Sequence, residues 1–395
     1  LFISQDYMRV YNYGNIFSHL LGYINKPNQS EISLPYIANM PNLDIGKEGL
    51  ERSFNPTLVG KAGKREIEVN SAGRIIREIS RVDSKKGKDL KLTLDLRLQT
   101  YALDLLNVHK AGSIVVMNIE NGHILCMAST PSYNPNKIIK KPNKEYWSTI
   151  LQNELSPLTF RSIQGLYAPG STFKMIVAIA ALYYGVIDTN SSHNCSGKIS
   201  LGDRLYHCWK NNGHGSLSVV GAIQQSCDVF FYEISKKIGI DKIAEVAKDF
   251  GLGKIYDIPL KNQKLGIIPS KKWKKQNLDE SWYPGETLIS AIGQGFVLTN
   301  PLQLANMTSI IASDGKIIHP KIIIDGTSQN NENLDKYKTA INIIKSSMFK
   351  VVNEVKGTAF KSKSDEILFS GKTGTSQVRR ITVAERESDD FRKKE

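Results

Sequence analysis

Cysteine, acidic residues and long apolar runs are all scarce in this chain of 395 residues. Its 4 cysteines are too few to build a disulfide scaffold in a chain of this size. The longest apolar run, from Met175 to Val186, covers about 12 residues, whereas a helix needs about 18–20 to span a bilayer. No secretory signal pattern opens the sequence. The composition thus indicates neither a disulfide-built protein nor a spanning segment within these residues.

What is present is the composition of a globular protein with a sizeable core. Apolar residues make up 41% of the chain and charged residues 23%, which excludes disordered, collagen-like and low-complexity classes. The length suits two or three domains. Lysine and arginine number 52 against 38 acidic residues, and this surplus favours an anionic partner such as nucleic acid, a membrane surface or a wall polymer. Because the chain begins at Leu1 within a polar–apolar pattern, we expect a longer protein with an anchor upstream.

Residues 1–89 are predicted to form a first domain rich in short strands. Residues 65–70 alternate polar and apolar side chains, a pattern typical of a half-buried strand. The turn residues 70–73 follow, and residues 74–79 are the expected partner strand of a hairpin. The all-polar stretch 83–89 then marks a domain boundary.

Residues 90–395 are predicted to form a second domain of the α+β or α/β class. A strand at 92–94 precedes a helix that Asp95 can cap. The pair Asn121-Gly122 predicts a tight turn between two antiparallel strands. The strands of that hairpin are expected at 111–117 and 123–129, and later helices at 173–185, 217–239 and 241–250. Helix-rich sequence thus lies between strands that open and close the unit.

Three short motifs in the second domain can carry chemistry: Ser171-Thr172-Phe173-Lys174, Ser226-Cys227-Asp228 and Lys372-Thr373-Gly374-Thr375. Each motif by itself is weak evidence for a catalytic site. For S-x-x-K, a serine and a lysine at this spacing are usually a solvated surface pair. The S-x-x-K pattern occurs again at Ser313 and Ser347, and the S-x-D pattern occurs again at Ser388. Only Lys-Thr-Gly is unique in the chain.

The surroundings of Ser171 distinguish it from Ser313 and Ser347. The residues Ala168-Pro169-Gly170 break any earlier element, and a strongly apolar helix follows. Ser171 is therefore expected at the N-terminus of a buried helix, with Lys174 one turn further along the same face. Burial removes solvent from the lysine and favours its neutral amine. A serine with such a base in reach is an activated nucleophile.

The order S-x-x-K, S-x-D, K-T-G on one chain resembles the penicillin-binding and serine β-lactamase superfamily. Longer stretches resemble its class B penicillin-binding proteins, and among these the elongation-specific transpeptidases. In the second domain these stretches are residues 164–174, 209–215, 226–232, 293–295 and 301–303. In the first domain they are residues 9–23 and 46–51, so the resemblance covers nearly the whole chain.

The resemblance implies the α+β fold of this superfamily. Residues 90–395 would form a β-lactamase/transpeptidase-like sheet with a helical subdomain. Residues 1–89 would form a mostly β, non-catalytic pedestal that is incomplete at its N-terminus. After Val378 the family continues with a further strand and a closing helix, whereas this chain continues with charged residues. We therefore expect a transpeptidase domain that ends after its K-T-G strand.

The resemblance also implies acyl transfer on peptidoglycan stem peptides ending in D-Ala-D-Ala, with no cofactor for the chemistry. Lys174 would take the proton of Ser171, which attacks the penultimate carbonyl, and Ser226 would relay a proton to the leaving amine. The backbone N–H groups of Ser171 and Thr375 would stabilise the oxyanion. The substrate would be held by Lys372, Thr373, Gly374 and Thr375.

Asp228 leaves two interpretations open. A carboxylate near Lys174 favours the charged amine and opposes its action as a base. Asp228 therefore either takes part in the chemistry, sharing its charge with Lys372, or only ties its loop down.

The implied partners are stem peptides, β-lactams, a membrane glycosyltransferase and other proteins of the elongation complex. The implied location is the periplasmic face of the bacterial inner membrane, through an N-terminal anchor. Nucleic acid is not expected, because the basic stretch around Trp273 is more typical of a solvated surface. Two rival functions are a D,D-carboxypeptidase or β-lactamase, for which no local base for water is evident, and a non-catalytic scaffold that activates a glycosyltransferase.

Three of the 4 cysteines and three of the 7 histidines lie between residues 193 and 227. A structural zinc ion is predicted there, because three thiolates and one imidazole are a common tetrahedral set. The proposed ligands are Cys195, Cys208, His214 and Cys227.

The position of Cys227 would give such a zinc ion a mechanical role. Because this cysteine lies inside the S-x-D motif, a metal there would brace the loop that carries Ser226 and Asp228. His193 and His207 are substitute ligands. Two alternatives stay open, namely a Cys195–Cys208 disulfide, which suits an oxidising compartment, and three unrelated buried thiols.

Overall fold

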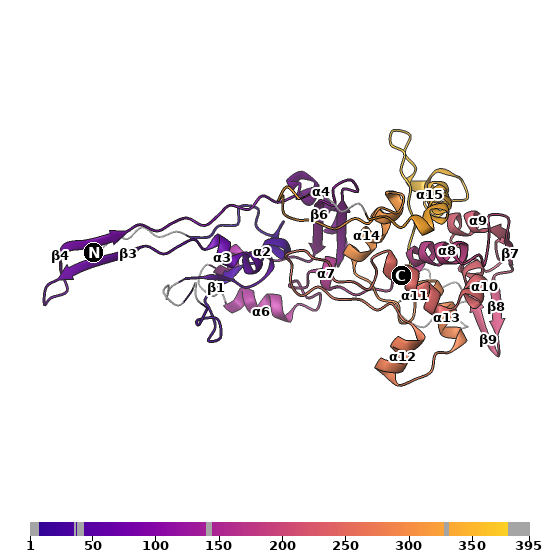
Figure 1. Cartoon of the computed structure of the whole chain (residues 1–395), viewed down its shortest axis with the longest axis horizontal. Coiled ribbons are helices and arrows are strands. Elements are labelled where there is room, and N and C mark those ends of the chain that lie inside the picture. The colour runs from indigo at the N-terminus through magenta and orange to yellow at the C-terminus, as the bar shows by residue number, and fades with distance from the viewer. Residues whose placement is uncertain (1–7, 35–36, 38–42, 140–143, 328–331, 378–395) are drawn as a thin grey trace. The chain divides into compact units, whose positions relative to one another are not determined.

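A computed structural model describes residues 8–34, 37, 43–139, 144–327 and 332–377 (Figure 1). The chain forms two compact units. The first comprises residues 1–165, 255–264 and 319–329, and the second comprises residues 166–254, 265–318 and 330–395. Among the described residues, none of the helices has both the length and the apolar character needed to cross a bilayer. The division expected at residue 89 stays a prediction.

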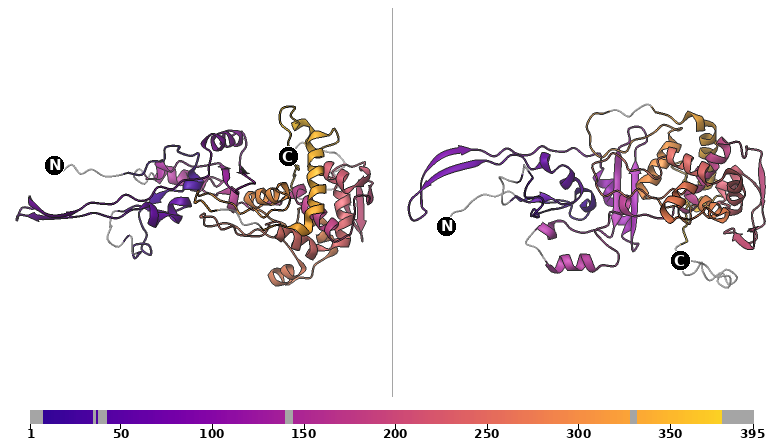
Figure 2. Two further views of the ribbon diagram at one scale, coloured as in Figure 1. Left: turned by 45° about the horizontal axis from the view of Figure 1, so that its top comes forward. Right: turned by 60° about the horizontal axis from the view of Figure 1, so that its bottom comes forward.

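The first unit contains a β-hairpin with one helix packed on it. Strands β5 (Gly112–Met117) and β6 (Ile124–Thr130) pair antiparallel, as predicted (Figure 2). The helix α4 (Leu96–Leu106) begins where the Asp95 carboxylate accepts the N–H of Leu98, which confirms the predicted cap. The expected strand at 92–94 is reduced to one bridge, from Leu92 to Ile323. A small core fills the contact between helix and hairpin: Ala102, Leu106, Cys126 and Ala128.

Short elements make up the rest of the first unit. The strands β1 (Ile24–Asn25) and β2 (Ile45–Gly46) pair antiparallel. The chain turns sharply at Gly22, where a Cβ would lie 1.9 Å from the carbonyl oxygen of Glu48, so only glycine fits. The short helices are α1 (Ser18–Leu21), α2 (Gly49–Ser53), α3 (Asn55–Leu58), α5 (Asn136–Ile139), α6 (Lys144–Gln152) and α7 (Arg161–Gln164).

The hairpin predicted near residues 65–79 is present, but the expectation that it is half-buried is wrong. It consists of β3 (Lys64–Val69) and β4 (Ile75–Val82), and every residue of the two strands except Glu68 is exposed. Alternation of polar and apolar side chains marks a half-buried strand only where another layer packs on one face. Here Ile76 and Ile79 remain 60% and 59% exposed.

A buried helix is the centre of the second unit. The helix α8 (Lys174–Tyr183) is enclosed by α9 (Val219–Gln224), α10 (Asp228–Ile238), α11 (Ile240–Asp249) and α15 (Lys338–Asn353) (Figures 1 and 2). Its residues 174–181 are each no more than 2% exposed. The other helices of the unit are α12 (Lys271–Leu278), α13 (Pro284–Ala291) and α14 (Pro301–Ala312).

Two expected elements of the second unit differ in the structure. The helix predicted at 217–239 is interrupted between α9 and α10, because Ser226 adopts a left-handed conformation with φ of +55°. The K-T-G segment forms no strand: residues 363–377 contain neither helix nor strand. A strand needs a partner to hydrogen-bond, and none of the described segments pairs with it.

Two small ribbons project from the helices of the second unit. The strand β7 (Ser192–Cys195) pairs with β10 (Gly215–Ser218), and β8 (Lys198–Leu201) pairs with β9 (Arg204–His207). Because β7 and β10 lie side by side, they bring residues 19 positions apart, such as Cys195 and His214, together.

His19 makes the stability of the first unit dependent on pH. Its ring stacks on Phe160 and meets Tyr133 edge-on, and its Nε2–H donates to the carbonyl of Pro157 over 2.7 Å. Burial lowers the pKa of His19 to about 4. The unfolded chain, with an ordinary histidine pKa near 6.5, therefore binds the proton more readily.

We predict that this unit loses about 2 kcal/mol of unfolding free energy between pH 7 and pH 5. The loss begins as the pH falls below about 6.5 and continues toward pH 4. Urea unfolding of the intact chain at both pH values measures it. The His19→Gln variant should lose this part of the pH dependence, and the exposed His109→Gln should retain it. A wild-type slope equal to that of His19→Gln would contradict the prediction.

Candidate active site

Ser171 lies in the 3-10 turn η1 (Gly170–Phe173), directly before α8. The turn is held on both sides: the N–H of Gly170 donates to Gly293 O over 2.9 Å, and Thr172 Oγ1 donates to Pro169 O over 2.7 Å. Ser171 itself is half-buried. The structure thus places this serine at the start of a buried helix, where the first backbone N–H groups have no helical acceptor.

Lys174 follows Ser171 by one turn and is completely buried. Its Nζ donates to Asp228 Oδ1 over 2.7 Å, to Ser226 O over 2.9 Å and to Ser226 Oγ over 3.4 Å. It also lies 5.6 Å from the centre of the Phe231 ring. The side-chain hydrogen bonds of Lys174 in the described residues therefore go to the S-x-D motif.

Asp228 is shared between the lysine and the chain that precedes β10. Its Oδ1 accepts from Lys174, and its Oδ2 accepts the backbone N–H of Trp209 over 2.8 Å. Asp228 is also the first residue of α10, where an acidic side chain interacts favourably with the free N–H groups of the helix. The same carboxylate thus both neutralises Lys174 and ties down its surroundings.

Ser226 is the point on which both lysines converge. Lys372 Nζ donates to Ser226 Oγ over 2.9 Å, opposite the weaker 3.4 Å bond from Lys174. Burial, followed by the nearby charge of Lys174, lowers the pKa of Lys372 to about 7, although Asp228 acts in the opposite direction. A hydroxyl has one proton and two lone pairs. Since both lysines donate to it, the proton of Ser226 is free for a third group.

The K-T-G segment approaches η1 closely because both sides carry glycine. A Cβ on Gly170 would lie 2.4 Å from Thr375 O, and a Cβ on Gly374 would lie 3.0 Å from the side chain of Thr172. A Cβ on Gly293 would lie 2.1 Å from Gly170 O. The backbones of Gly293, Gly170 and Thr375 are therefore stacked in direct contact.

Sequence reasoning assigned no role to Gly293 or Trp209, which both support the site. Gly293 packs on the turn before Ser171, and its own φ is +70°. The indole N–H of Trp209 donates to the carbonyls of Gln225 and Ser226, each over 3.1 Å. Both residues lay in stretches noted only for their resemblance to the family, and spacing alone carries no signal of such long-range contacts.

A cavity of about 250 Å³ lies beside the same segment. It is bounded by Gly374 and Ser376 and by Tyr167, Pro169 and Thr172. Ser171, Lys174 and Lys372 do not line it. The chemistry therefore belongs to the converging polar groups rather than to this mostly apolar hollow.

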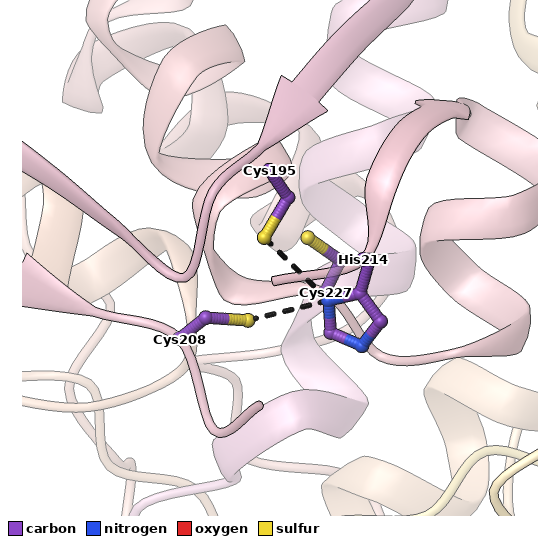
Figure 3. A group of neighbouring side chains, drawn as sticks. All are labelled: Cys195, Cys208, His214 and Cys227. Atoms are coloured by element: carbon purple, nitrogen blue, oxygen red, sulfur yellow. Dashed lines mark hydrogen bonds between the residues drawn. The ribbon is translucent and has the colours of Figure 1, made fainter. Parts of the chain in front are cut away.

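The four predicted metal ligands form one cluster (Figure 3). Their ligand atoms all lie within 4.8 Å of one another, and His214 Nδ1 is 3.6 Å from Cys195 Sγ and 3.5 Å from Cys208 Sγ. Around a zinc ion such ligand atoms are roughly 3.5–3.8 Å apart. All 4 cysteines are free thiols in the structure, so the Cys195–Cys208 disulfide is not the observed arrangement. His193 lies apart, edge-on to Phe230.

The chemistry of the cluster fits a metal site. Hydrogen bonds from Cys227 and then from His214 hold the pKa of the Cys208 thiol well below its usual range, which favours the thiolate that a metal needs. His214 directs Nδ1 at the sulfur atoms, and its buried Nε2 has no hydrogen-bond partner in the described residues. Cys227 caps α10, accepting from the N–H of Phe230. The donor set therefore fits zinc.

Three features together define a class of protein. They are a serine at the start of a helix, two lysines that donate to a second serine, and a K-T-G segment packed against glycine backbone. It is the class of the penicillin-binding and serine β-lactamase superfamily, in which the same three motifs occur in this order. The α+β fold expected for that class is the fold observed.

Comparison with known proteins identifies the family. The penicillin-binding protein transpeptidase domain matches residues 112–388, and the penicillin-binding protein dimerisation domain matches residues 1–92. The chain belongs to the penicillin-binding protein transpeptidase family. The resemblance predicted from the three motifs is thereby confirmed.

Individual relatives are peptidoglycan D,D-transpeptidases and structures of penicillin-binding protein 2. The chain is 34% identical over 389 residues to the peptidoglycan D,D-transpeptidase MrdA of Escherichia coli K12, covering 94% of this chain and 61% of that protein. The penicillin-binding protein 2 in a complex with MreC from Helicobacter pylori superposes with a TM-score of 0.85 at 31% identity, covering 93% of this chain and 69% of that one. Penicillin-binding protein 2 of Pseudomonas aeruginosa superposes with a TM-score of 0.79 at 31% identity, covering 94% and 81%. The chain thus spans about 61% of the length of the first curated relative.

The Lys174–Asp228 pair yields a test of stability in the second unit. We predict that Asp228→Asn costs about 3 kcal/mol of unfolding free energy, because it leaves a buried ammonium without its counter-ion. The double variant Lys174→Met, Asp228→Asn should recover most of that loss. Urea unfolding at pH 7 measures both.

The exposed pair of Lys363 with Asp365, 3.4 Å apart, is the matched control. Asp365→Ala should change the unfolding free energy by about 1 kcal/mol or less, because surface ion pairs contribute little. If Asp228→Asn cost no more than this control, the buried pair would not be the anchor of the site.

Proposed function

We propose that this protein is a peptidoglycan D,D-transpeptidase that acts in cell elongation through a serine acyl-enzyme, with Ser171 as the nucleophile. The observation that carries the proposal is the convergence of Lys174 and Lys372 on Ser226, beside the turn that holds Ser171. The names of the relatives support it, since the matched Escherichia coli protein is a peptidoglycan D,D-transpeptidase.

In the proposed reaction, Ser171 attacks the carbonyl of the penultimate D-Ala, and its proton passes to Lys174. Lys174 in its neutral form accepts this proton and can pass a proton on to Ser226 Oγ, to which its Nζ donates over 3.4 Å. Lys372 Nζ donates to the same oxygen over 2.9 Å, so it leaves the Ser226 proton directed away from both lysines. Asp228 keeps the remaining charge compensated, so we assign it a part in the chemistry as well as in tying the loop.

The oxyanion would be held by the backbone N–H groups of Ser171 and Thr375. Their spacing is set by Gly170, which lies between them in contact with Thr375. Each such donor contributes about 3–4 kcal/mol to stabilising the transition state. The leaving D-Ala takes its proton from Ser226, and Lys174 replaces it with the proton that it accepted from Ser171. The acyl-enzyme is then resolved by an amine of a neighbouring stem peptide, while the hydroxyls of Thr373 and Thr375 and the charge of Lys372 hold the substrate carboxylate.

A fluorescent penicillin tests the assignment. We expect covalent label on Ser171, no label on Ser171→Ala or Lys174→Ala, and labelling of Lys372→Ala slowed by about 100-fold, because Lys372 serves both the carboxylate and the proton path. Ser313→Ala removes the serine of a second S-x-x-K pattern and is the matched control. Label that persists in Ser171→Ala and disappears in Ser313→Ala would overturn the assignment.

The same experiment separates the two rival functions. A β-lactamase would release the hydrolysed penicillin with turnover, whereas a transpeptidase retains a stable adduct. A D,D-carboxypeptidase would release D-Ala from a stem peptide without forming a cross-link. A non-catalytic scaffold would remain unlabelled.

We assign residues 1–89 to a pedestal that does no chemistry and binds partners. One solved relative is in a complex with MreC, and another belongs to a peptidoglycan synthase complex that coordinates polymerisation and cross-linking. By the same logic this chain would bind elongation-complex proteins and a membrane glycosyltransferase. It would act at the periplasmic face of the bacterial inner membrane through an N-terminal anchor. The exposed apolar residues of the hairpin β3–β4 are consistent with a partner-binding surface.

We also propose that Cys195, Cys208, His214 and Cys227 hold a structural zinc ion. The chemistry of transpeptidation needs none, so the ion would act through the loops it joins. Cys208 precedes Trp209, whose N–H binds Asp228, and Cys227 precedes Asp228 itself. A metal held by both cysteines would fix the carboxylate that pairs with Lys174.

Elemental analysis of the purified chain tests the metal site. We expect one zinc per chain, lost in Cys208→Ser and in His214→Ala, with a lower unfolding temperature in each. The matched control is Cys126→Ser, which removes a buried thiol from the core beneath α4, outside the cluster. A metal-free protein with all three cluster thiols titratable would overturn the zinc proposal and leave the alternative of free thiols.

A further inference from the structure

The K-T-G segment depends on a helix and a loop rather than on a sheet for its position. None of the described segments pairs with residues 363–377 as a strand. The helix α15 supplies two of the bonds that hold it: the N–H of Gly371 donates to Met348 O over 3.2 Å, and Asn353 Nδ2 donates to Phe369 O over 3.0 Å. A further contact comes from the loop that follows α15.

That loop is rigidly attached to the end of the helix. The N–H of Gly357 donates to Glu354 O over 2.8 Å, and the N–H of Ala359 donates to Val351 O over 3.0 Å. A Cβ on Gly357 would lie 2.1 Å from Val351 O, so the loop lies directly against the last turn of α15. Thr358, between these two anchors, has little freedom to move.

Thr358 connects the S-x-D motif with the K-T-G motif. Its N–H donates to Gln224 O over 3.2 Å, two residues before Ser226. Its hydroxyl lies 2.7 Å from the hydroxyl of Thr373. The side chain of Gln224 closes the connection by donating to Glu354 Oε2 over 2.9 Å. Thr358, which lies outside all three motifs, thus contacts the K-T-G motif and the segment that leads into the S-x-D motif.

The bond between the two hydroxyls has a direction that matters for binding. A threonine hydroxyl has a single proton. If Thr373 gave that proton to Thr358, it could only repel a carboxylate. If Thr358 donates instead, the proton of Thr373 is available to an anion while one of its lone pairs stays occupied.

We infer that Thr358 is a positioning residue that donates its hydroxyl proton to Thr373 and so directs the Thr373 hydroxyl toward the carboxylate of the substrate or β-lactam. The inference rests on the proposed function, and it concerns recognition of the carboxylate rather than the attack by Ser171. Thr358 is exposed, so its bond adds little to folding, and replacing it should leave the fold intact.

The test compares benzylpenicillin with its methyl ester, which has the same reactive ring and no carboxylate. The measurement is the second-order rate constant of acylation for each compound with the purified chain. In wild type the acid should react faster than the ester. Thr358→Val, which keeps the shape and removes the hydroxyl, should lower the acid-to-ester ratio about 10-fold, because a charge-assisted hydrogen bond is misdirected. Its rate with the ester should stay within about twofold of wild type.

Two variants complete the comparison. Thr358→Ser retains the hydroxyl and should keep the wild-type ratio, and Thr373→Val should lose the preference for the acid whether or not Thr358 is also replaced. Equal slowing of acid and ester in Thr358→Val would mean that the residue is merely structural and would overturn the inference. An unchanged ratio would do the same. A wild-type chain that neither compound acylates would overturn the proposed function itself.

Discussion

The buried ion pair between Lys174 and Asp228 is the constraint on which the second unit depends. An ammonium group with no exposed surface is unfavourable unless a carboxylate and other acceptors surround it. The apolar helix α8 carries Lys174 into the core, so Asp228 must reach it from another element. That requirement explains the interruption between α9 and α10, where Ser226 adopts φ of +55° and turns its carbonyl and its hydroxyl toward the lysine.

Two other features of the site, the stacked glycine backbones and the cysteine–histidine cluster, hold separate segments of the chain close to this ion pair. Stacked glycine backbones set the distance between η1 and the K-T-G segment, because any side chain at Gly170 or Gly293 would collide with the neighbouring backbone. The cluster of Cys195, Cys208, His214 and Cys227 joins two ribbons to the start of α10, directly beside Asp228. The site is therefore held in position by short-range contacts between loops, which pack against the buried helix α8 or the turn η1 that precedes it.

The sequence predicted correctly those features that depend on neighbouring residues, and it failed where contacts between distant residues decide the structure. The cap of α4 by Asp95 and the two hairpins were predicted correctly, since each depends on residues a few positions apart. The errors are long-range in origin. The hairpin β3–β4 has the pattern of a half-buried strand without a covering layer, and the helix predicted at 217–239 is interrupted where Ser226 turns toward Lys174. Within the part of the chain that the structure describes, no segment pairs with the K-T-G residues to make them a strand.

The sequence by itself determined which chemical groups this protein carries and in what order. They are the serine of an S-x-x-K motif, the serine of an S-x-D motif, a K-T-G segment and a concentration of cysteine and histidine. It could do so because the motifs are local and a helix fixes Ser171 and Lys174 one turn apart. Only the tertiary structure decided how those groups are connected. Asp228 pairs with Lys174 rather than Lys372, both lysines bind Ser226, and the four side chains of the proposed zinc site converge. These contacts join residues up to 146 positions apart, and such distances are set by the packing of the whole unit rather than by any local pattern.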